Sequence, residues 1–400
     1  MNNELAKIFS ELAAAYKKPS VDNDAIAELF ARAAELCGTG VNLSDIESDT
    51  EPLQKIIFDA SNGDENAIFK LKKLAKENFQ AKAALEKLYY DEQKKNAVGT
   101  LILHDGLKYI EDNEFQNLKN ITKLVLPESL IGIGEKSFSG CISLEEIYFP
   151  KTLTSLGEGA FKGCNRLKKI NLPNSLSHIG ANAFRDCADL KAVQLPAGLT
   201  EIGEGVFRGC ISLTKIDFPA ALTLIGANAF EGCVNLQGII FPEGLKSIGS
   251  NAFENCTKMR EVALPAGLNS IGSQTFKSCG LKTITIPLSL ASSGSCAFGN
   301  DLEEVIFAKG TTSIGNGVLA NYPRLKKIIL PEGLTSIGSN TFYKSGLEKV
   351  TFPKSLKFIG ADAFKYSNVE YVTCSEITKK LLDDSDIGLD YDKITWNIID

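Results

Sequence analysis

The sequence predicts an α+β protein in which a helical N-terminal domain, residues 1–95, precedes a curved solenoid, residues 96–375, and a C-terminal cap, residues 376–400. Three observations support this prediction. Prolines recur at intervals of 23 residues from Pro127 to Pro265. Apolar residues before each proline have the spacing of a short strand, whereas the first 95 residues have helical spacing instead. A fixed period of roughly 20 to 50 residues is the sequence signature of a solenoid.

The N-terminal domain is expected to begin with two helices, the first ending near Pro19 and the second at Gly38. A third helix is expected after Pro52. Two more are expected around Ala67 and Ala81, where the same short apolar pattern occurs twice. We interpret the domain as a bundle that covers the apolar edge of the first coil. A separate recognition domain is the alternative.

One repeat, the sequence CISLEEIYFPKTLTSLGEGAFKG from Cys141 to Gly163, shows what each position is expected to do. Leu144, Ile147 and Phe149 have the spacing of a strand that points its side chains inward. Pro150 ends this strand because it fixes φ and lacks an N–H group. The strand positions begin near Val98 and recur to Cys374, which predicts about thirteen coils of 21–23 residues that share a parallel sheet.

The second half of each repeat carries another inward pair, then a glycine and a phenylalanine. In the repeat above these are Leu153, Leu156, Gly157 and Phe161. The recurring glycine is expected to adopt a positive φ in a turn. The recurring phenylalanines are expected to stack along the solenoid, with Leu319 as the only substitute. The glycines stand at positions 134, 157, 180, 203, 226, 249, 272, 294, 315, 338 and 360.

The motif L-x-x-I-x-[LF]-P-x-x-L-x-x-I-G-x-x-x-F-x-x-C recurs between residues 98 and 375 and resembles the BspA-like, or Treponema-type, leucine-rich repeat family. The resemblance covers about two thirds of the chain. It implies a curved right-handed solenoid with a parallel sheet on its concave side. It also implies a role in protein recognition, often as an adhesin on the surface of bacteria or protists.

Seven of the ten cysteines occupy one repeat position, from Cys141 to Cys279 at intervals of 23 residues. A redox-active or metal-binding row is one interpretation. A row of buried structural thiols is favoured, because seven is an odd number, the row contains no CxxC motif, and free cysteine is often fully buried.

Composition excludes several classes of function. A net charge of −6 and a pI near 5.3 disfavour binding to nucleic acid. Two histidines, His104 and His178, leave little material for metal or general-base chemistry. We therefore expect no enzyme activity, no cofactor and no metal site. The acidic run that begins at Asp383 is interpreted as part of a solvated cap and not as a calcium site.

Targeting patterns point to a cytoplasmic protein. Lys7, Ser10 and Glu11 interrupt the apolar residues at the N-terminus, so no signal-peptide core forms there. No apolar run is long enough to span a bilayer, and membrane insertion is not expected. Export by a non-classical route stays open.

The residues that point outward from the predicted sheet are expected to bind the partner, because they vary while the inward residues repeat. Exposed isoleucines in this set would have no packing role, which is typical of a protein interface. β-branched residues that merely suit a strand are the alternative. The candidate partner-binding residues are Tyr148, Asn171, Gln194, Asp217, Ile240, Ala263, Glu304, Ile306, Lys327 and Ile329.

A second outward row is rich in hydroxyl side chains, including Thr154, Ser177 and Thr223. It could bind glycans, or its hydroxyls could satisfy backbone groups. The hypothesis that follows from the whole sequence is a non-enzymatic protein–protein interaction scaffold whose concave face binds a macromolecule. The alternative is a surface or secreted adhesin for a host protein or glycan.

Overall fold

The computed structural model describes residues 53–75, 97–103, 105–292 and 297–399. The chain divides into two compact units, one of residues 1–107 with 124–129 and the other of residues 108–123 with 130–400. Each unit is described by itself below. His104, Gly294 and two of the ten cysteines, Cys37 and Cys296, lie outside the described residues.

The first unit contains two described helices, α3 (Leu53–Ser61) and α4 (Glu65–Leu74). Asp64 begins α4, because its carboxylate accepts a hydrogen bond of 2.9 Å from the N–H of Ala67. Ala67 and Leu71 are buried against Ile56 and Ala60 of α3. These helices match the third and fourth helices that the sequence predicts. The other expected helices fall outside the described residues, so the helical domain of residues 1–95 stays a prediction.

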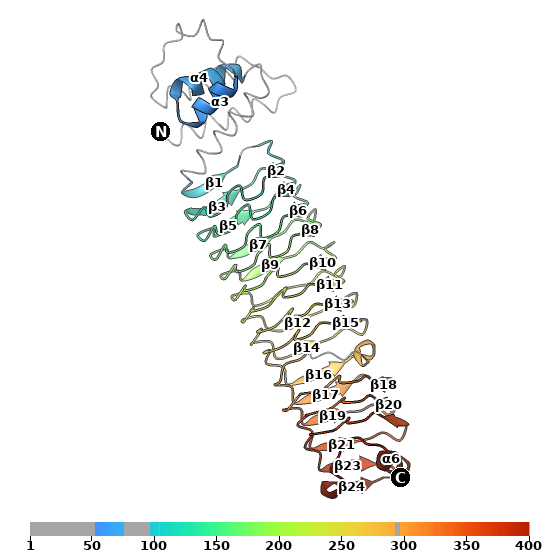
Figure 1. Cartoon of the computed structure of the whole chain (residues 1–400). Helices are drawn as coiled ribbons and strands as arrows, with labels where there is room; N and C mark the ends of the chain where they lie inside the picture. The colour runs from blue at the N-terminus through green and yellow to red at the C-terminus, as the bar shows by residue number, and fades with distance from the viewer. Residues whose placement is uncertain (1–52, 76–96, 104, 293–296, 400) are drawn as a thin grey trace. The chain divides into compact units, whose positions relative to one another are not determined.

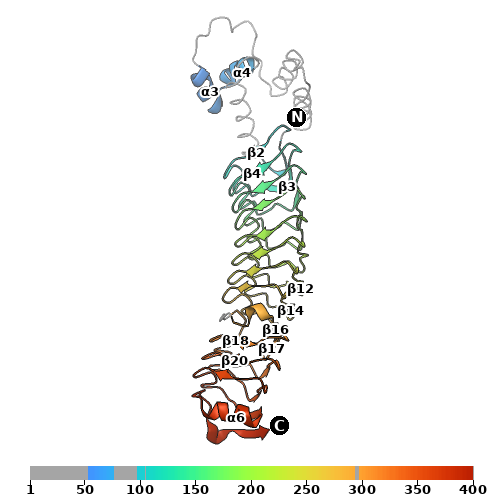
Figure 2. The same ribbon diagram turned by 90° about the vertical axis from the view of Figure 1, so that its right-hand side faces the viewer.

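The described residues from 97 onward form a parallel β-solenoid of about thirteen coils stacked in a column (Figures 1 and 2), and all of it except residues 97–107 and 124–129 belongs to the second unit. Most coils add one strand to a longer row of sheets, called here the first face. The strands of this face are β1 (Gly99–Ile102), β3 (Ile121–Val125), β5 (Glu146–Tyr148), β7 (Lys169–Asn171), β9 (Ala192–Gln194), β12 (Ile239–Ile240), β14 (Val262–Ala263), β16 (Thr283–Ile286), β17 (Glu304–Phe307), β19 (Lys327–Ile329), β21 (Lys349–Thr351), β23 (Tyr371–Cys374) and β24 (Thr395–Ile398).

Most coils add a second, two-residue strand to another side of the column, called here the second face. The sequence predicts only an inward pair at these positions. The strands are β2 (Tyr109–Ile110), β4 (Gly132–Ile133), β6 (Ser155–Leu156), β8 (His178–Ile179), β10 (Glu201–Ile202), β11 (Leu224–Ile225), β13 (Ser247–Ile248), β15 (Ser270–Ile271), β18 (Ser313–Ile314), β20 (Ser336–Ile337) and β22 (Phe358–Ile359).

Neighbouring strands pair in parallel with a register of one whole repeat. On the first face Ile240 lies opposite Ala263, and on the second face Leu156 lies opposite Ile179. Equivalent residues of successive coils therefore stand side by side. On each face the strands form several short sheets in place of one continuous sheet.

The inward positions are buried as the spacing predicts, and the phenylalanine stack is present. Successive rings from Phe115 to Phe298 are nearly parallel, with centroids 5.2 to 6.1 Å apart. Leu319 interrupts the stack and is itself buried. In the same coil the buried Tyr322 takes the cysteine position, and its hydroxyl donates to the carbonyl of Phe298 at 3.4 Å. In this coil a smaller leucine therefore replaces the phenylalanine, and a larger tyrosine replaces the cysteine.

The prediction that the recurring glycine needs a positive φ is wrong. None of the described glycines at this position has a positive φ. A Cβ atom on nine of them would instead lie 2.2 to 2.7 Å from an atom of the preceding coil, too close for any side chain. Gly203 alone has room, since the nearest atom would be 3.6 Å away. The glycine is therefore required for the close approach of successive coils.

Positive φ occurs two residues after this glycine instead. Asn182 (φ 58°), Asn228 (φ 56°) and Asn340 (φ 56°) stand at this position, and Gly159 or Gly205 takes it in other coils. Asparagine and glycine tolerate this conformation best. The turn that leads into each buried phenylalanine is built on these residues.

The last residues complete the final coils. Helix α6 (Glu376–Asp383) begins at Ser375, whose hydroxyl accepts from the N–H of Thr378 at 3.2 Å. A short 3₁₀ turn (Tyr391–Lys393) follows, and β24 then pairs in parallel with β23. The tail, which is expected to form a cap, therefore also extends the sheets of the first face.

Candidate functional site

The candidate partner-binding residues lie together on the outward side of the first face. Asn171 stands opposite Gln194 and Ile306 opposite Ile329 in the strand register. Asp217 occupies the equivalent place in a coil without a regular strand. The structure thus brings all ten residues onto one surface, which we call the outer face; it is formed by Tyr148, Asn171, Gln194, Asp217, Ile240, Ala263, Glu304, Ile306, Lys327 and Ile329.

Apolar side chains on the outer face differ widely in exposure. Ile240 is 88% exposed, Tyr148 is 64% exposed and Ile329 is 41% exposed, whereas Ile306 is half-buried. The neighbouring Ile239 points inward and is buried. The packing of the solenoid therefore does not explain the isoleucine at position 240.

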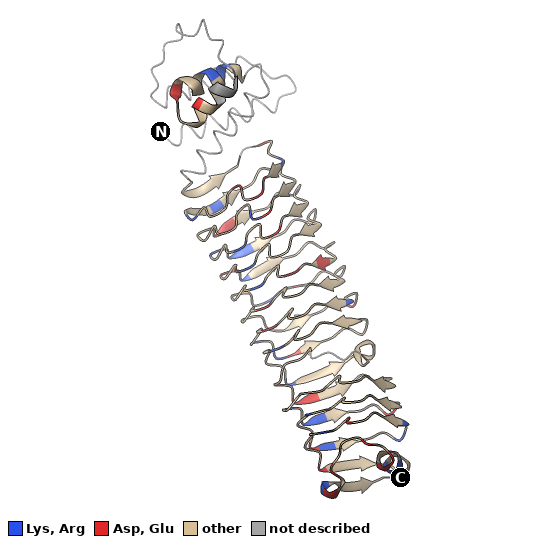
Figure 3. Ribbon diagram, viewed as in Figure 1, with Lys and Arg blue, Asp and Glu red and all other residues tan. Residues whose placement is uncertain are grey.

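Charges also concentrate on the first face (Figure 3), whereas Glu201 is the only charged residue in the described strands of the second face. Lys327 pairs with Glu304 at 2.6 Å across two strands. Lys215 pairs with Asp217 at 2.8 Å within one coil. These exposed pairs contribute little stability, because water screens them. The three charged residues of the outer face, Asp217, Glu304 and Lys327, are thus all paired with an opposite charge.

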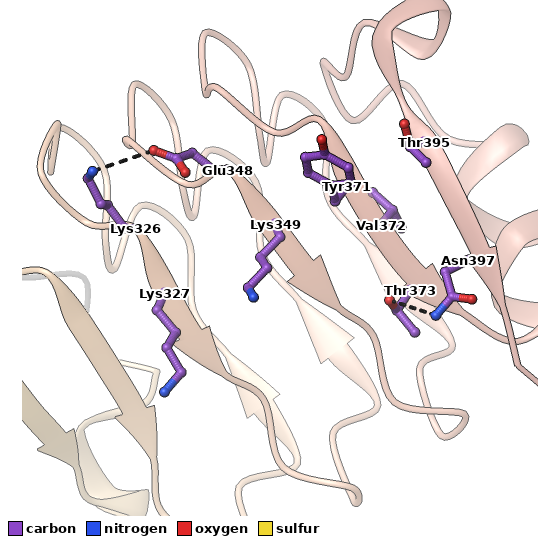
Figure 4. Close-up of a pocket in the computed structure, with 9 residues that line it drawn as sticks. All are labelled: Lys326, Lys327, Glu348, Lys349, Tyr371, Val372, Thr373, Thr395 and Asn397. Atoms are coloured by element: carbon purple, nitrogen blue, oxygen red, sulfur yellow. Dashed lines mark hydrogen bonds and ion pairs between the residues drawn. The ribbon is translucent and has the colours of Figure 1, made fainter.

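A groove of about 630 Å³ lies at the end of the outer face nearest the C-terminus (Figure 4). Its lining comes from strands β19, β21, β23 and β24 and from the residues that precede β19 and β21. Asn397 donates to the hydroxyl of Thr373 at 3.4 Å, and Lys326 pairs with Glu348 at 3.6 Å. The lining residues are Lys326, Lys327, Glu348, Lys349, Tyr371, Val372, Thr373, Thr395 and Asn397.

The candidate list contains only Lys327 from this groove. Lys349 belongs to the same outward row, so its position could be read from the repeat. Thr395 and Asn397 could not, because the sequence TWNI of β24 lacks the proline and the leucine spacing of the template. The only available signal is the alternation of polar and apolar residues over four positions.

The cysteine row has no exposed thiol. Each Sγ from Cys141 to Cys279 donates a hydrogen bond of 3.1 to 3.3 Å to the carbonyl of the phenylalanine in the preceding coil. Burial raises the pKa of Cys141 and of Cys233 to about 12, so these thiols stay protonated and are poor nucleophiles. The geometry supports the structural interpretation of the row.

Four side chains in the outward row of hydroxyls donate to backbone carbonyls. Thr154, Thr223 and Thr335 each donate to a carbonyl of the preceding coil at 2.9 to 3.1 Å. Ser177 does the same at 3.3 Å. This favours the interpretation that the row satisfies backbone groups.

Two kinds of feature are absent from the residues that the structure describes: a metal-binding cluster and a membrane-spanning helix. Among them no three or more His, Cys, Asp or Glu side chains cluster in a way that could hold a metal ion. No described helix has the length and apolar composition needed to span a bilayer.

Comparison with known proteins identifies the repeat. The model of the BspA type leucine-rich repeat region matches residues 89–203, 177–302 and 299–385, most of the chain. The chain belongs to this family. No curated protein matches the BspA-type chain.

One solved structure supports the solenoid fold, and two others are similar at lower TM-scores. A leucine-rich repeat protein from Bacteroides ovatus is 25% identical with a TM-score of 0.58, over 77% of this chain and 85% of that one. One from Eubacterium ventriosum is 20% identical with a TM-score of 0.40, over 70% and 85% of the two chains. The leucine-rich repeat protein of T. pallidum is 27% identical with a TM-score of 0.34, over 45% and 76%.

Proposed function

We propose that this BspA-type chain is a non-enzymatic interaction scaffold that binds a protein on the outer face of its solenoid. The exposed side chain of Ile240 carries the proposal, because an isoleucine with 88% exposure is not explained by packing. Ala263 lies beside it in the strand register and extends the apolar surface. Ion pairs flank this apolar region, and such a polar surround is typical of protein interfaces.

The test is capture of partner proteins by the immobilised full-length chain from a lysate of its source organism. The double variant Ile240→Asp, Ile306→Asp is expected to reduce capture of the main bound species at least about tenfold, because two charges would have to be desolvated in the interface. The single variant Ile240→Asp is expected to leave the thermal midpoint unchanged, since its side chain makes no buried contact.

Ile211→Asp is the matched control. Ile211 is 47% exposed and follows Cys210 in a turn outside the outer face. Capture by this variant is expected to equal that by the wild type. Equal capture by the wild type and the double variant would show that the partner binds elsewhere on the chain.

Location in the cytoplasm forms part of the proposal, with a surface or secreted adhesin as its alternative. Protease treatment of intact cells separates the two. We expect the chain to be cleaved only after lysis, and cleavage on intact cells would favour the adhesin.

A further inference from the structure

We propose that the groove formed by β19, β21, β23 and β24 binds a short oligosaccharide that carries a carboxylate. Lys327, Lys349, Tyr371 and Thr395 form one outward row over four successive coils, and Figure 4 shows their side chains along it. At roughly 4.8 Å per coil this row is about 14 Å long, enough for a trisaccharide. The site does not depend on the apolar surface around Ile240.

The charges of the groove leave a single cation without a partner. Glu348 is paired with Lys326 at 3.6 Å, and Lys327 is paired with Glu304 at 2.6 Å. Among the residues that the structure describes, Lys349 has no acidic partner. One unpaired ammonium group suits a ligand with one carboxylate at that point, and a charge-assisted hydrogen bond would hold it.

Tyr371 supplies an apolar surface next to this cation. Its side chain is 55% exposed and lies directly opposite Lys349 in the strand register. A tyrosine ring combines an apolar face with a polar hydroxyl. The C–H groups on one face of a pyranose can stack on such a ring while the sugar hydroxyls reach the polar groups around it.

The rest of the lining mixes donors and acceptors at short intervals. Thr373 and Asn397 are already joined by a hydrogen bond of 3.4 Å and keep further donor and acceptor capacity, and Thr395 adds a hydroxyl. Sugar hydroxyls both donate and accept, so they match this set. An acidic peptide would instead bring several carboxylates toward one free lysine and two paired glutamates, Glu304 and Glu348.

The experiment is calorimetric titration of the full-length chain with 3′-sialyllactose and with a trisaccharide that carries one terminal glucuronate, with maltotriose as the neutral probe. At least one acidic saccharide is expected to bind. Lys349→Met is expected to weaken its binding at least about tenfold without affecting maltotriose, and Tyr371→Ala to weaken both. Both side chains are exposed, so the variants are expected to fold as the wild type does.

Lys169→Met and Tyr148→Ala are the controls, because both residues are exposed on the same face outside the groove. Their affinity for the acidic saccharide should equal that of the wild type. No heat signal with any acidic saccharide at roughly 10 mM would overturn the proposal. So would unchanged binding by Lys349→Met, or a hexaglutamate peptide that binds more tightly than every saccharide and depends on Lys349. Loss of protein capture by Ile240→Asp tests the other site separately.

Discussion

At the scale of single residues, the spacing between coils decides which side chains are allowed. Successive coils approach so closely at the recurring glycine that a Cβ atom on Gly272 would lie 2.2 Å from the backbone nitrogen of Ser250. Two residues later the constraint changes to a positive φ, which Asn228 and Gly205 satisfy. The same turn thus constrains two positions for different physical reasons: the first excludes a Cβ atom, and the second requires a positive φ.

Gly249 and Gly203 provide a direct test of this distinction. A Cβ atom on Gly249 would lie 2.4 Å from the nitrogen of Ala227, so Gly249→Ala is expected to lower the free energy of unfolding by about 1 to 3 kcal/mol. Gly203→Ala is expected to be neutral or to raise it by about 0.4 to 1 kcal/mol, because it meets no close atom and restricts the unfolded chain. Urea titration of both variants measures the difference. Equal losses would show that close approach is not the reason for the glycine.

At the scale of elements, the repeat makes the interior of each coil predictable, whereas strands that depart from the repeat template are hard to predict. Inward positions such as Ile147 and Phe161 follow from spacing, because every coil buries the same set. The two-residue strands of the second face are too short to show any alternation. The reason for the recurring glycine cannot be read from the sequence, because a positive φ and a close contact between coils both select glycine. The groove depends on β24, which has lost the template.

The cysteine row makes a prediction at this same scale, through the dependence of stability on pH. Burial raises the pKa of Cys233 from 9.0 to about 12 and also raises those of Cys187 and Cys210. Above about pH 9 the unfolded chain therefore loses thiol protons that the folded chain keeps. The contribution of these thiols to the free energy of unfolding is fully present below pH 9 and is lost as the pH rises toward 12.

As the pH rises from 8 to about 10, ionisation of each such thiol in the unfolded chain is expected to lower the free energy of unfolding by about 1.4 kcal/mol. The triple variant of Cys187, Cys210 and Cys233 to alanine should therefore lose about 4 kcal/mol less than the wild type over this range, whatever its stability at pH 8. Urea titrations at the two pH values give both changes. Parallel losses in the two proteins would mean that the thiols ionise as readily in the folded chain.

At the scale of the solenoid, function and stability depend on different parts of each coil. The interior is nearly identical from coil to coil, so it carries no information about a partner. The outer face varies, and the apolar surface at Ile240 and the polar groove at Tyr371 differ in chemistry. Because neighbouring coils bury each other, a substitution on the outer face can change binding without disturbing the stack.

At the C-terminal end of the stack, stability depends on residues outside the repeat. We expect residues 376–400 to act as a cap there. Phe364 donates its N–H to the carbonyl of Ile387 at 2.9 Å, and both side chains are buried. Leu382 of α6 is buried as well, whereas Ile377 is 80% exposed. Without these residues Phe364 and the apolar interior of the last coil would be exposed to water, and an exposed apolar surface favours association with a second chain.

Deletion of residues 376–400 is therefore expected to convert the chain into soluble oligomers or aggregates, and Leu382→Asp should shift it in the same direction. Ile377→Asp changes an exposed position of the same helix and should leave the mass distribution of the wild type unchanged. Size-exclusion chromatography with light scattering measures all three variants. The cap assignment fails if the truncated chain has the same oligomeric state and thermal midpoint as the wild type, since the last coil would then need no cover.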